Sequence, residues 1–240
     1  MTEDRVHGMR DLLGRYYHKH CGERCFVLGN GPSLNKLDLS KLSDEWLFGC
    51  NCIYLKRDEL ERGVDYYFLV DTILAPQIQH EVNEYLSHGD IKVLFLHSAY
   101  TDIIHDNGAD VIVSQWSNVV PSFSNTGTLM VIIAAYMGFN PVYMIGMDAN
   151  YDGIVDGSRP IRRNVHTLIG DDQWHFDPNY SRKPDGTSIE FIFGVDEASL
   201  MLAGFDRAYG IAAGCGCSVF NAGVDSRLQI FEKVDYESLF

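Results

Sequence analysis

Apolar residues occur along the chain in short, continuous runs rather than in alternation with polar residues. The runs are rich in Val, Ile, Phe and Tyr, residues that favour strands. Continuous apolar strands are typical of a parallel sheet with both faces covered by other elements. The strands predicted in this way are Arg24–Leu28, Trp46–Gly49, Tyr66–Val70, Ile91–Leu96, Asp110–Val113, Val142–Ile145 and Cys217–Phe220.

Segments of helix length separate several of these runs. Alternating strands and helices predict a single Rossmann-like domain over residues 1–240, with a doubly wound, mostly parallel α/β sheet. Residues 3–20 have the spacing of an amphipathic helix, with Met9, Leu12, Leu13 and Tyr16 on one face. The other predicted helices are Ile73–Ser87, Thr128–Gly138 and Val195–Gly210, and the glycines ending the last two stand where C-caps are expected.

One long stretch, from residue 150 to about 188, interrupts this alternation. The sequence predicts no regular element there, and connections of this length are usually functional or disordered. We interpret residues 150–188 as an irregular lid because they carry the side chains of Trp174, His175, Phe176 and Tyr180 close together.

The formal net charge of −14 restricts the partners. A field of this sign repels nucleic acid and anionic membranes unless a local basic patch overcomes it. No stretch reaches the roughly 18 apolar residues of a membrane span, and the polar N-terminus is not that of a signal peptide. We expect a cytoplasmic protein without a nucleic-acid partner and leave self-association open. Peripheral membrane contact also stays open because of one dense basic cluster: Arg159, Arg162, Arg163, Arg182 and Lys183.

The six cysteines include two pairs with i, i+2 spacing, Cys50/Cys52 and Cys215/Cys217. In a strand this spacing would place both members of a pair on one face. Zinc knuckles use C-x₂-C, and no histidine pair follows at a suitable distance. We therefore expect buried, reduced thiols and no metal ligands, with a structural zinc site as the alternative.

The turn Gly29–Ser33, with sequence Gly-Asn-Gly-Pro-Ser, directly follows the first predicted strand. Doubly wound folds bind nucleotide phosphates at such strand ends. Gly29, Asn30, Gly31 and Ser33 are therefore candidate ligand-binding residues, and a plain tight turn is the alternative. Leu34 stands where the dinucleotide pattern G-x-G-x-x-G requires its third glycine, which disfavours a dinucleotide.

Polar residues also follow other predicted strands: Asn51, Asp71 and Asp148. In a parallel sheet these side chains converge on one edge, although each alone is more often a helix N-cap. Thr126, Gly127 and Thr128 open an apolar helix, which predicts either an anion site or simple capping. His175 lies between aromatic residues and is a candidate general base near neutral pH, with a packing role as the alternative.

These residues together resemble the small bacterial CMP-sialic-acid-dependent sialyltransferases, which have a single Rossmann-like domain of the variant GT-A type. The resemblance rests on Gly29–Leu34, Cys50-Asn51, the Ser/Thr-Gly helix start and the segment Gly138–Asp148. His175 matches their catalytic histidine in position. Asp71 departs from the pattern, because those enzymes tend to place there an amide that contacts the donor.

The resemblance extends to the motility-accessory flagellin glycosyltransferases and the archaeal 6-hydroxymethylpterin pyrophosphokinases. The closing segments Val219–Gly223 and Leu228–Tyr236 are similar to those of this wider group. It implies that Gly29–Ser33, Asn30 and Asn51 hold a nucleotide's phosphate and ribose, and that Thr126–Thr128 bracket its base or sugar.

The same resemblance implies a reaction. Tyr151 and Tyr180 would hydrogen-bond the phosphate of a CMP-sugar donor, and His175 would deprotonate a glycan acceptor, with no cofactor required. Two other functions stay open. A pyrophosphokinase would need Mg²⁺, with Asp71, Asp148 and Asp152 as possible ligands. A non-catalytic nucleotide-binding module would have no use for His175.

Overall fold

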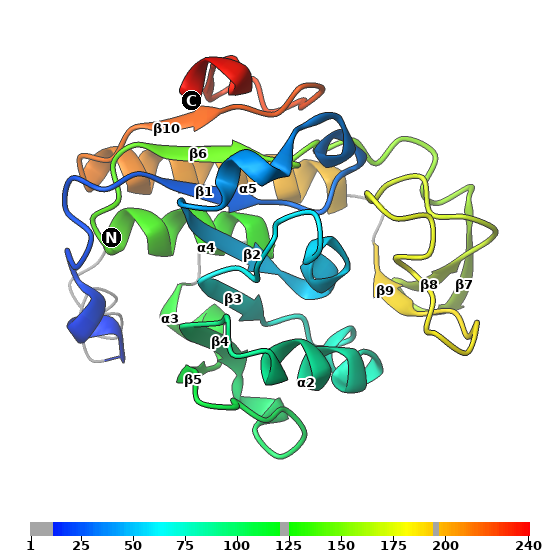
Figure 1. Ribbon diagram of the computed structural model, residues 1–240. Helices are drawn as coiled ribbons and strands as arrows, with labels where there is room; N and C mark the ends of the chain where they lie inside the picture. Colours follow the sequence, from blue (N-terminus) through cyan, green and yellow to red (C-terminus); the bar gives the residue numbers. More distant parts are fainter. Residues whose placement is uncertain (1–11, 121–124, 194–196) are drawn as a thin grey trace.

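The computed structural model describes residues 12–120, 125–193 and 197–240. It confirms the α/β fold with a parallel sheet, whose eight strands run in the order β11-β10-β6-β1-β2-β3-β4-β5. Figure 1 shows them from β10 at the top to β5 at the bottom. The strands are β1 Cys25–Leu28, β2 Trp46–Cys50, β3 Tyr66–Leu69, β4 Val93–His97, β5 Asp110–Ser114, β6 Val142–Ile145, β10 Val219–Asn221 and β11 Glu232–Lys233. The chain adds β2 to β5 on one side of β1 and β6, β10 and β11 on the other.

Both faces of the sheet are covered, which explains its apolar strands. One face packs against α3 (Trp116–Val119), α4 (Thr126–Tyr136) and α5 (Glu197–Gly214). The described side chains of α4 are almost all buried, because this helix lies between the sheet and α5 (Figure 1). The other face packs against α2 (Gln79–Ser87) and several 3₁₀ helices. The 3₁₀ helices of the chain are η1 Gly14–Tyr16, η2 Pro32–Lys36, η3 Leu39–Leu42, η4 Asn51–Lys56, η5 Ala75–Gln77, η6 Ser98–Tyr100 and η7 Tyr236–Leu239.

Two helix predictions need correction. The helix predicted over residues 3–20 does not continue beyond Tyr16, and its residues 3–11 lie outside the described part. After Tyr16 the backbone N–H groups of His18 and His20 instead donate to carbonyls at the end of α4. Gly138 (φ +89°) follows α4 in the left-handed conformation expected of a C-cap. Gly210 is not a cap, because α5 continues to Gly214.

The lid was predicted to be irregular, but it contains a small antiparallel sheet (right in Figure 1). Its strands are β7 Ser158–Arg162, β8 Val165–Leu168 and β9 Glu190–Ile192, so the lid extends past residue 188. Ile154, Leu168 and Phe193 form its own hydrophobic cluster. The lid is docked onto the sheet domain, because the Phe176 N–H donates to the Asn30 carbonyl at 2.9 Å and the Phe176 ring is buried.

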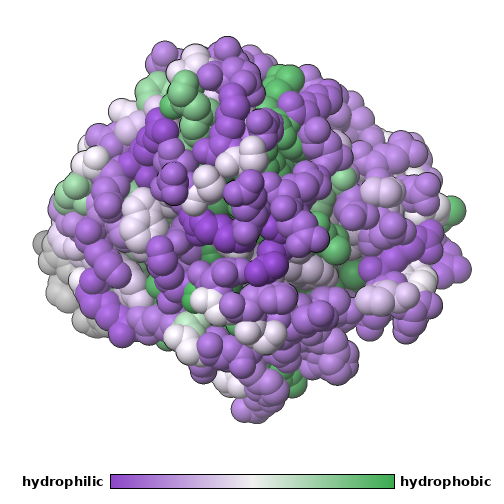
Figure 2. All heavy atoms as spheres, viewed as in Figure 1, coloured by the Kyte–Doolittle hydropathy of each residue, from purple (hydrophilic) through white to green (hydrophobic). Residues whose placement is uncertain are grey.

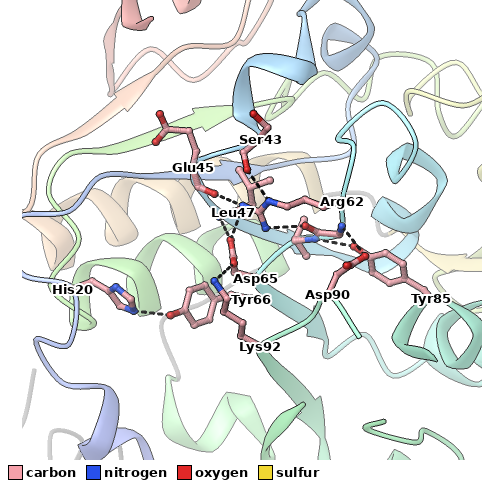
Figure 3. Close-up of polar contacts among 12 residues, drawn as sticks. His20, Ser43, Glu45, Leu47, Arg62, Asp65, Tyr66, Tyr85, Asp90 and Lys92 are labelled. Carbon is pink, nitrogen blue, oxygen red and sulfur yellow. Dashed lines mark hydrogen bonds and ion pairs between the residues drawn. The ribbon is translucent and has the colours of Figure 1, made fainter. Parts of the chain in front are cut away.

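The buried carboxylate of Asp65 links β2, β3 and β4 at the amino ends of these strands (Figure 3). Asp65, just before β3, accepts hydrogen bonds from the backbone N–H of Leu47 (2.9 Å) and from Arg62 (3.2 Å). The Lys92 ammonium lies 2.7 Å from its other oxygen and 4.0 Å from the centre of the Trp46 ring. The two cations balance the buried carboxylate, so we assign this network to stability.

Cys50 and Cys52 do not share a face, and Cys215 and Cys217 do not lie in a strand. Cys50 ends β2 and packs on the α4 side of the sheet, whereas Cys52 lies in η4 and packs on the other side. Burial raises the pKa of both thiols to about 12, so they are protonated at neutral pH. Cys25 and Cys217 are also buried free thiols, as predicted, but Cys21 and Cys215 are exposed.

Within the described ranges, no helix combines the length and the apolar character needed to cross a membrane. The face seen in Figure 2 is mostly hydrophilic, with small, separate hydrophobic patches.

Candidate functional site

A cleft of about 480 Å³ lies at the carboxyl ends of the strands, between the sheet domain and the lid. Eleven of the thirteen predicted site residues line it: Gly29, Asn30, Gly31, Asn51, Asp71, Thr126, Gly127, Asp148, Tyr151, His175 and Tyr180. Ser33 and Thr128 do not line it. The structure therefore brings together residues that are more than a hundred positions apart in the sequence.

The glycine turn is shaped by its contact with the loop after β6. The N–H groups of Gly29 and Gly31 donate to the carbonyls of Ile145 and Gly146, both at 2.8 Å. A Cβ atom on Gly29 would lie 2.3 Å from the Gly146 oxygen, so packing alone requires glycine there. This contact corresponds to the tight-turn alternative, and it uses two N–H groups that were predicted to hold a phosphate.

Asp148 occupies the start of η2, where an anion was expected. One of its oxygens accepts the Ser33 N–H at 2.8 Å, and the other accepts the Ser33 hydroxyl. The Asp148 side chain therefore takes the place of a bound anion at the start of this 3₁₀ helix, and Ser33 is buried. A ligand phosphate would have to displace Asp148 or bind elsewhere in the cleft.

Two amide oxygens in the cleft wall lack hydrogen-bond donors within the described ranges, namely Asn30 Oδ1 and Asn51 Oδ1. The Asn30 amide nitrogen donates to the Cys50 carbonyl (3.2 Å) and the Tyr180 hydroxyl (2.8 Å), which fixes its orientation. Asn51 has a φ of +53°, a conformation uncommon outside glycine. A buried acceptor without a donor costs about 1–3 kcal/mol. A ligand hydroxyl or amine that reached either oxygen would recover this cost.

In the lid, the partly exposed His175 pairs with the buried Asp172. His175 Nδ1 lies 2.8 Å from Asp172 Oδ2, and the His175 ring stacks on Tyr180 at a centroid distance of 3.9 Å. The same Asp172 oxygen accepts the Ser181 hydroxyl at 2.5 Å, and Oδ1 accepts the backbone N–H groups of Trp174 and His175. Burial acts to raise the pKa of Asp172, but these hydrogen bonds outweigh it and hold the pKa below the usual value.

An ionised carboxylate can only accept hydrogen bonds, so the neutral His175 ring carries its proton on Nδ1. Nε2 then keeps a free lone pair, and the side chain, which lines the cleft, is 28% exposed. The pair therefore has the arrangement of a general base oriented by a carboxylate. Sequence reasoning missed Asp172, although its i, i+3 spacing to His175 was a usable signal.

The two tyrosines have different environments. Tyr180 is buried, its hydroxyl accepts the Asn30 amide, and burial raises its pKa. Its role in the structure is to support Asn30 and the His175 ring. Tyr151 lines the cleft, with its ring 5.6 Å from that of Phe193.

The start of α4 is capped by Asn125, which also lines the cleft and was missed. Its side chain accepts the Thr128 N–H at 2.9 Å, and the Thr128 hydroxyl donates to the Asn125 carbonyl at 2.8 Å. Thr128 is fully buried, so capping accounts for it. Thr126 and Gly127 do reach the cleft, where a Cβ on Gly127 would lie 2.9 Å from the sulfur of Met147.

Further residues of the cleft were also missed. His97 is the last residue of β4 and obeys the same strand-end rule that identified Asn51 and Asp71, so the sequence contained a usable signal for it. The apolar wall comes from the lid and α5, which only the tertiary fold brings to the cleft: Leu168, Phe191, Phe193, Met201 and Phe205.

The carboxylates do not fit the magnesium site that a pyrophosphokinase needs. Asp148 is engaged by Ser33, as described above. Asp152 does not line the cleft and forms a two-pronged ion pair with Arg227, at 2.9 and 2.6 Å. Only Asp71 keeps an uncommitted oxygen, and the described residues contain no group of three or more potential ligands placed to hold a metal ion.

Comparison with known proteins gives one similarity to report. No protein-family profile and no curated protein matches the chain. Among solved structures, it is similar to the MAf glycosyltransferase from Magnetospirillum magneticum AMB-1, with a TM-score of 0.57 and 15% identity. The match covers 98% of this chain but only 39% of that one. The similarity establishes the fold, which agrees with the sequence resemblance to the motility-accessory glycosyltransferases.

Proposed function

We propose that this protein is a glycosyltransferase that moves a sialic-acid-like sugar from a CMP-activated donor to a hydroxyl of a glycan acceptor. The observation that carries the proposal is the pairing of the buried Asp172 with His175, whose free imidazole nitrogen belongs to a side chain lining the cleft. The fold shared with the MAf glycosyltransferase supports it.

In the proposed reaction the acceptor oxygen attacks the anomeric carbon of the donor in line with the leaving phosphate. The bond between that carbon and the phosphate oxygen breaks, and its electron pair leaves with CMP. The acceptor's proton passes to His175 Nε2, and Asp172 stabilises the charged ring.

The nucleoside half of the donor would bind at the polar wall of the cleft. The unpaired oxygens of Asn30 and Asn51 suit the ribose hydroxyls or the amine of the base, since both are hydrogen-bond donors. Tyr151 would donate to the phosphate, and a CMP leaving group carries a single phosphate whose charge neutral donors can stabilise. We therefore propose that the reaction needs no metal ion.

A non-catalytic nucleotide-binding module is the second candidate, because Asn30 and Asn51 alone would serve it. A buried carboxylate oriented on His175 would have no purpose in such a module. The two functions therefore differ in whether His175 affects turnover or only binding.

The first experiment measures thermal unfolding with CMP, UDP, GDP and ATP, each with Mg²⁺ or with EDTA. We expect CMP to stabilise the protein in EDTA, by about 2.7 kcal/mol at a concentration a hundredfold above its dissociation constant. Stabilisation only by a nucleoside triphosphate with Mg²⁺ would contradict the proposal.

The second experiment measures transfer from a CMP-sugar and donor binding by calorimetry. We expect His175→Ala to lower turnover by about 10²–10⁴-fold with nearly unchanged donor affinity. His166→Ala is the matched control, because His166 lies in β8 of the same lid but does not line the cleft. Near-wild-type turnover of a folded His175→Ala protein would remove the general base from the proposal.

A further inference from the structure

Asp71 lies in the cleft wall after β3, and it is a carboxylate without a cation. Its Oδ1 accepts the backbone N–H groups of Ile73 (2.7 Å) and Leu74 (2.9 Å). Its Oδ2 has no hydrogen bond or ion pair within the described part of the chain. No lysine or arginine from that part lines the cleft.

The other two carboxylates of the cleft are engaged by protein groups. Asp148 is held by the Ser33 N–H and hydroxyl. Glu190 lies 2.8 Å from the Arg162 guanidinium. Among the described residues, Asp71 is therefore the cleft carboxylate that has neither a cation nor a partner for its second oxygen.

A hydrogen-bond donor lies at the end of the next strand. Asp71 follows β3 and His97 ends β4, and these two strands are parallel neighbours in which Leu69 pairs with Leu96. His97 Nδ1 accepts the Ala99 N–H at 3.2 Å, so the neutral ring carries its proton on Nε2 as a donor. A carboxylate acceptor and an imidazole donor thus line the same end of the cleft, together with Thr72 and Ser117.

We propose that this end of the cleft, formed by Asp71, Thr72, His97 and Ser117, is the subsite for the acceptor sugar. Asp71 makes the subsite selective for uncharged or amine-bearing sugars over anionic ones. Sugar hydroxyls both donate and accept, and hydrogen bonds to a carboxylate are about twice as strong as neutral ones. A carboxylate on the sugar would instead face Asp71 with no cation of the cleft to offset it. The acceptor role rests on the proposed function, whereas the charge selectivity does not.

The test uses three sugars that share one ring and differ in charge: galactosamine, galactose and galacturonate. Dissociation constants are measured by NMR titration of the full chain at low salt and near pH 7, where most of the amine is protonated. We expect affinity to fall in that order, by roughly tenfold per step, and the differences to shrink as salt is added.

Asp71→Asn should abolish this order, with the three dissociation constants converging to within about twofold. The asparagine oxygen can still accept the Ile73 and Leu74 N–H groups, so the fold is retained. Asp102→Asn is the matched control, because Asp102 is exposed and does not line the cleft. It should leave the order unchanged.

Three results would overturn the subsite: galacturonate binding as tightly as galactosamine, the order persisting in Asp71→Asn, or no saturable galactosamine binding. The proposed function is judged separately by the CMP experiment. If the sugar order holds and CMP does not bind, the charge-selective subsite stands and the transfer reaction is wrong.

Discussion

Replacing Asp172 by asparagine tests the orientation of His175 with a minimal change in volume. The asparagine oxygen can keep the two backbone N–H donors, Trp174 and His175, that now bind Oδ1. The amide nitrogen then takes the place of Oδ2, opposite His175 Nδ1 and the Ser181 hydroxyl. An amide N–H facing Nδ1 forces the imidazole proton onto Nε2, so the nitrogen that should act as the base loses its lone pair.

The Asp172→Asn substitution should have two effects, one on stability and one on turnover. Hydrogen bonds to a charged group contribute about 1.5–3 kcal/mol each, against about 0.5–1.5 for neutral ones. Neutralising the acceptor of two side-chain bonds should therefore lower the free energy of unfolding by about 2 kcal/mol, or about 4–8 °C in Tm for a chain of this size. Turnover should fall by about 10²–10⁴-fold, as expected when a general base holds the wrong tautomer.

The loss of stability should depend on pH in one direction. The pKa of Asp172 lies below its usual value of 3.8, because its hydrogen bonds to His175, Ser181 and Trp174 outweigh the opposing effect of burial. A depressed pKa stabilises the fold above the usual value, and this stabilisation disappears as pH falls through the native pKa. Wild type and Asp172→Asn should therefore differ near pH 7 and converge in stability below pH 3.8.

The assays are urea unfolding at several pH values, turnover with a CMP-sugar, and ¹⁵N NMR of the His175 ring. Asp171→Asn is the matched control, because Asp171 is exposed and adjacent. The NMR measurement applies even without a known substrate. Finding the neutral wild-type ring protonated on Nε2 would refute the reasoning, as would an unchanged tautomer in Asp172→Asn.

Two further changes test the packing that holds the cleft in place. Gly29→Ala should lower the free energy of unfolding, measured in urea, by about 3 kcal/mol, because its Cβ would lie 2.3 Å from the Gly146 oxygen. Gly210→Ala should raise the free energy of unfolding slightly, because Gly210 lies within α5 with open space around it. Equal stabilities for these two variants would contradict the close approach. Asp65→Ala should cost about 3 kcal/mol in the same assay, since it leaves a buried N–H and two cations without their acceptor (Figure 3), whereas the exposed Asp44→Ala should cost little. A small effect of Asp65→Ala would show that water replaces the carboxylate.

The sheet was predictable because its strands carry their own signal. Apolar runs such as Val142–Ile145 are buried on both faces, and the structure places a strand with those same bounds. The lid sheet was not predictable in this way, because β7 is almost entirely exposed and contains Pro160 and Arg162. Its pairing with β8 depends on contacts in space and not on an apolar pattern.

The cleft was predictable from a topological rule and not from any single motif. Parallel strands bring their carboxyl ends together, so Asn51, Asp71 and Asp148 meet although no local pattern links them. The rule does not say how each side chain is used. Thr128 and Ser33 satisfy the same rule, yet both are buried and serve as partners of other protein groups.

The glycine turn shows why a strand-end motif alone is weak support for phosphate binding. Gly29 and Gly31 are needed where the turn meets the loop after β6, and Asp148 supplies the anion that η2 requires. Because Asp148 already occupies this position, the start of η2 does not require a ligand phosphate. The same cleft leaves the oxygens of Asn30 and Asn51 without donors and orients His175 through Asp172. Under the proposed function, these groups would meet the ribose or base of the donor and the acceptor hydroxyl, and the phosphate would be the part of the donor with the fewest contacts in this cleft.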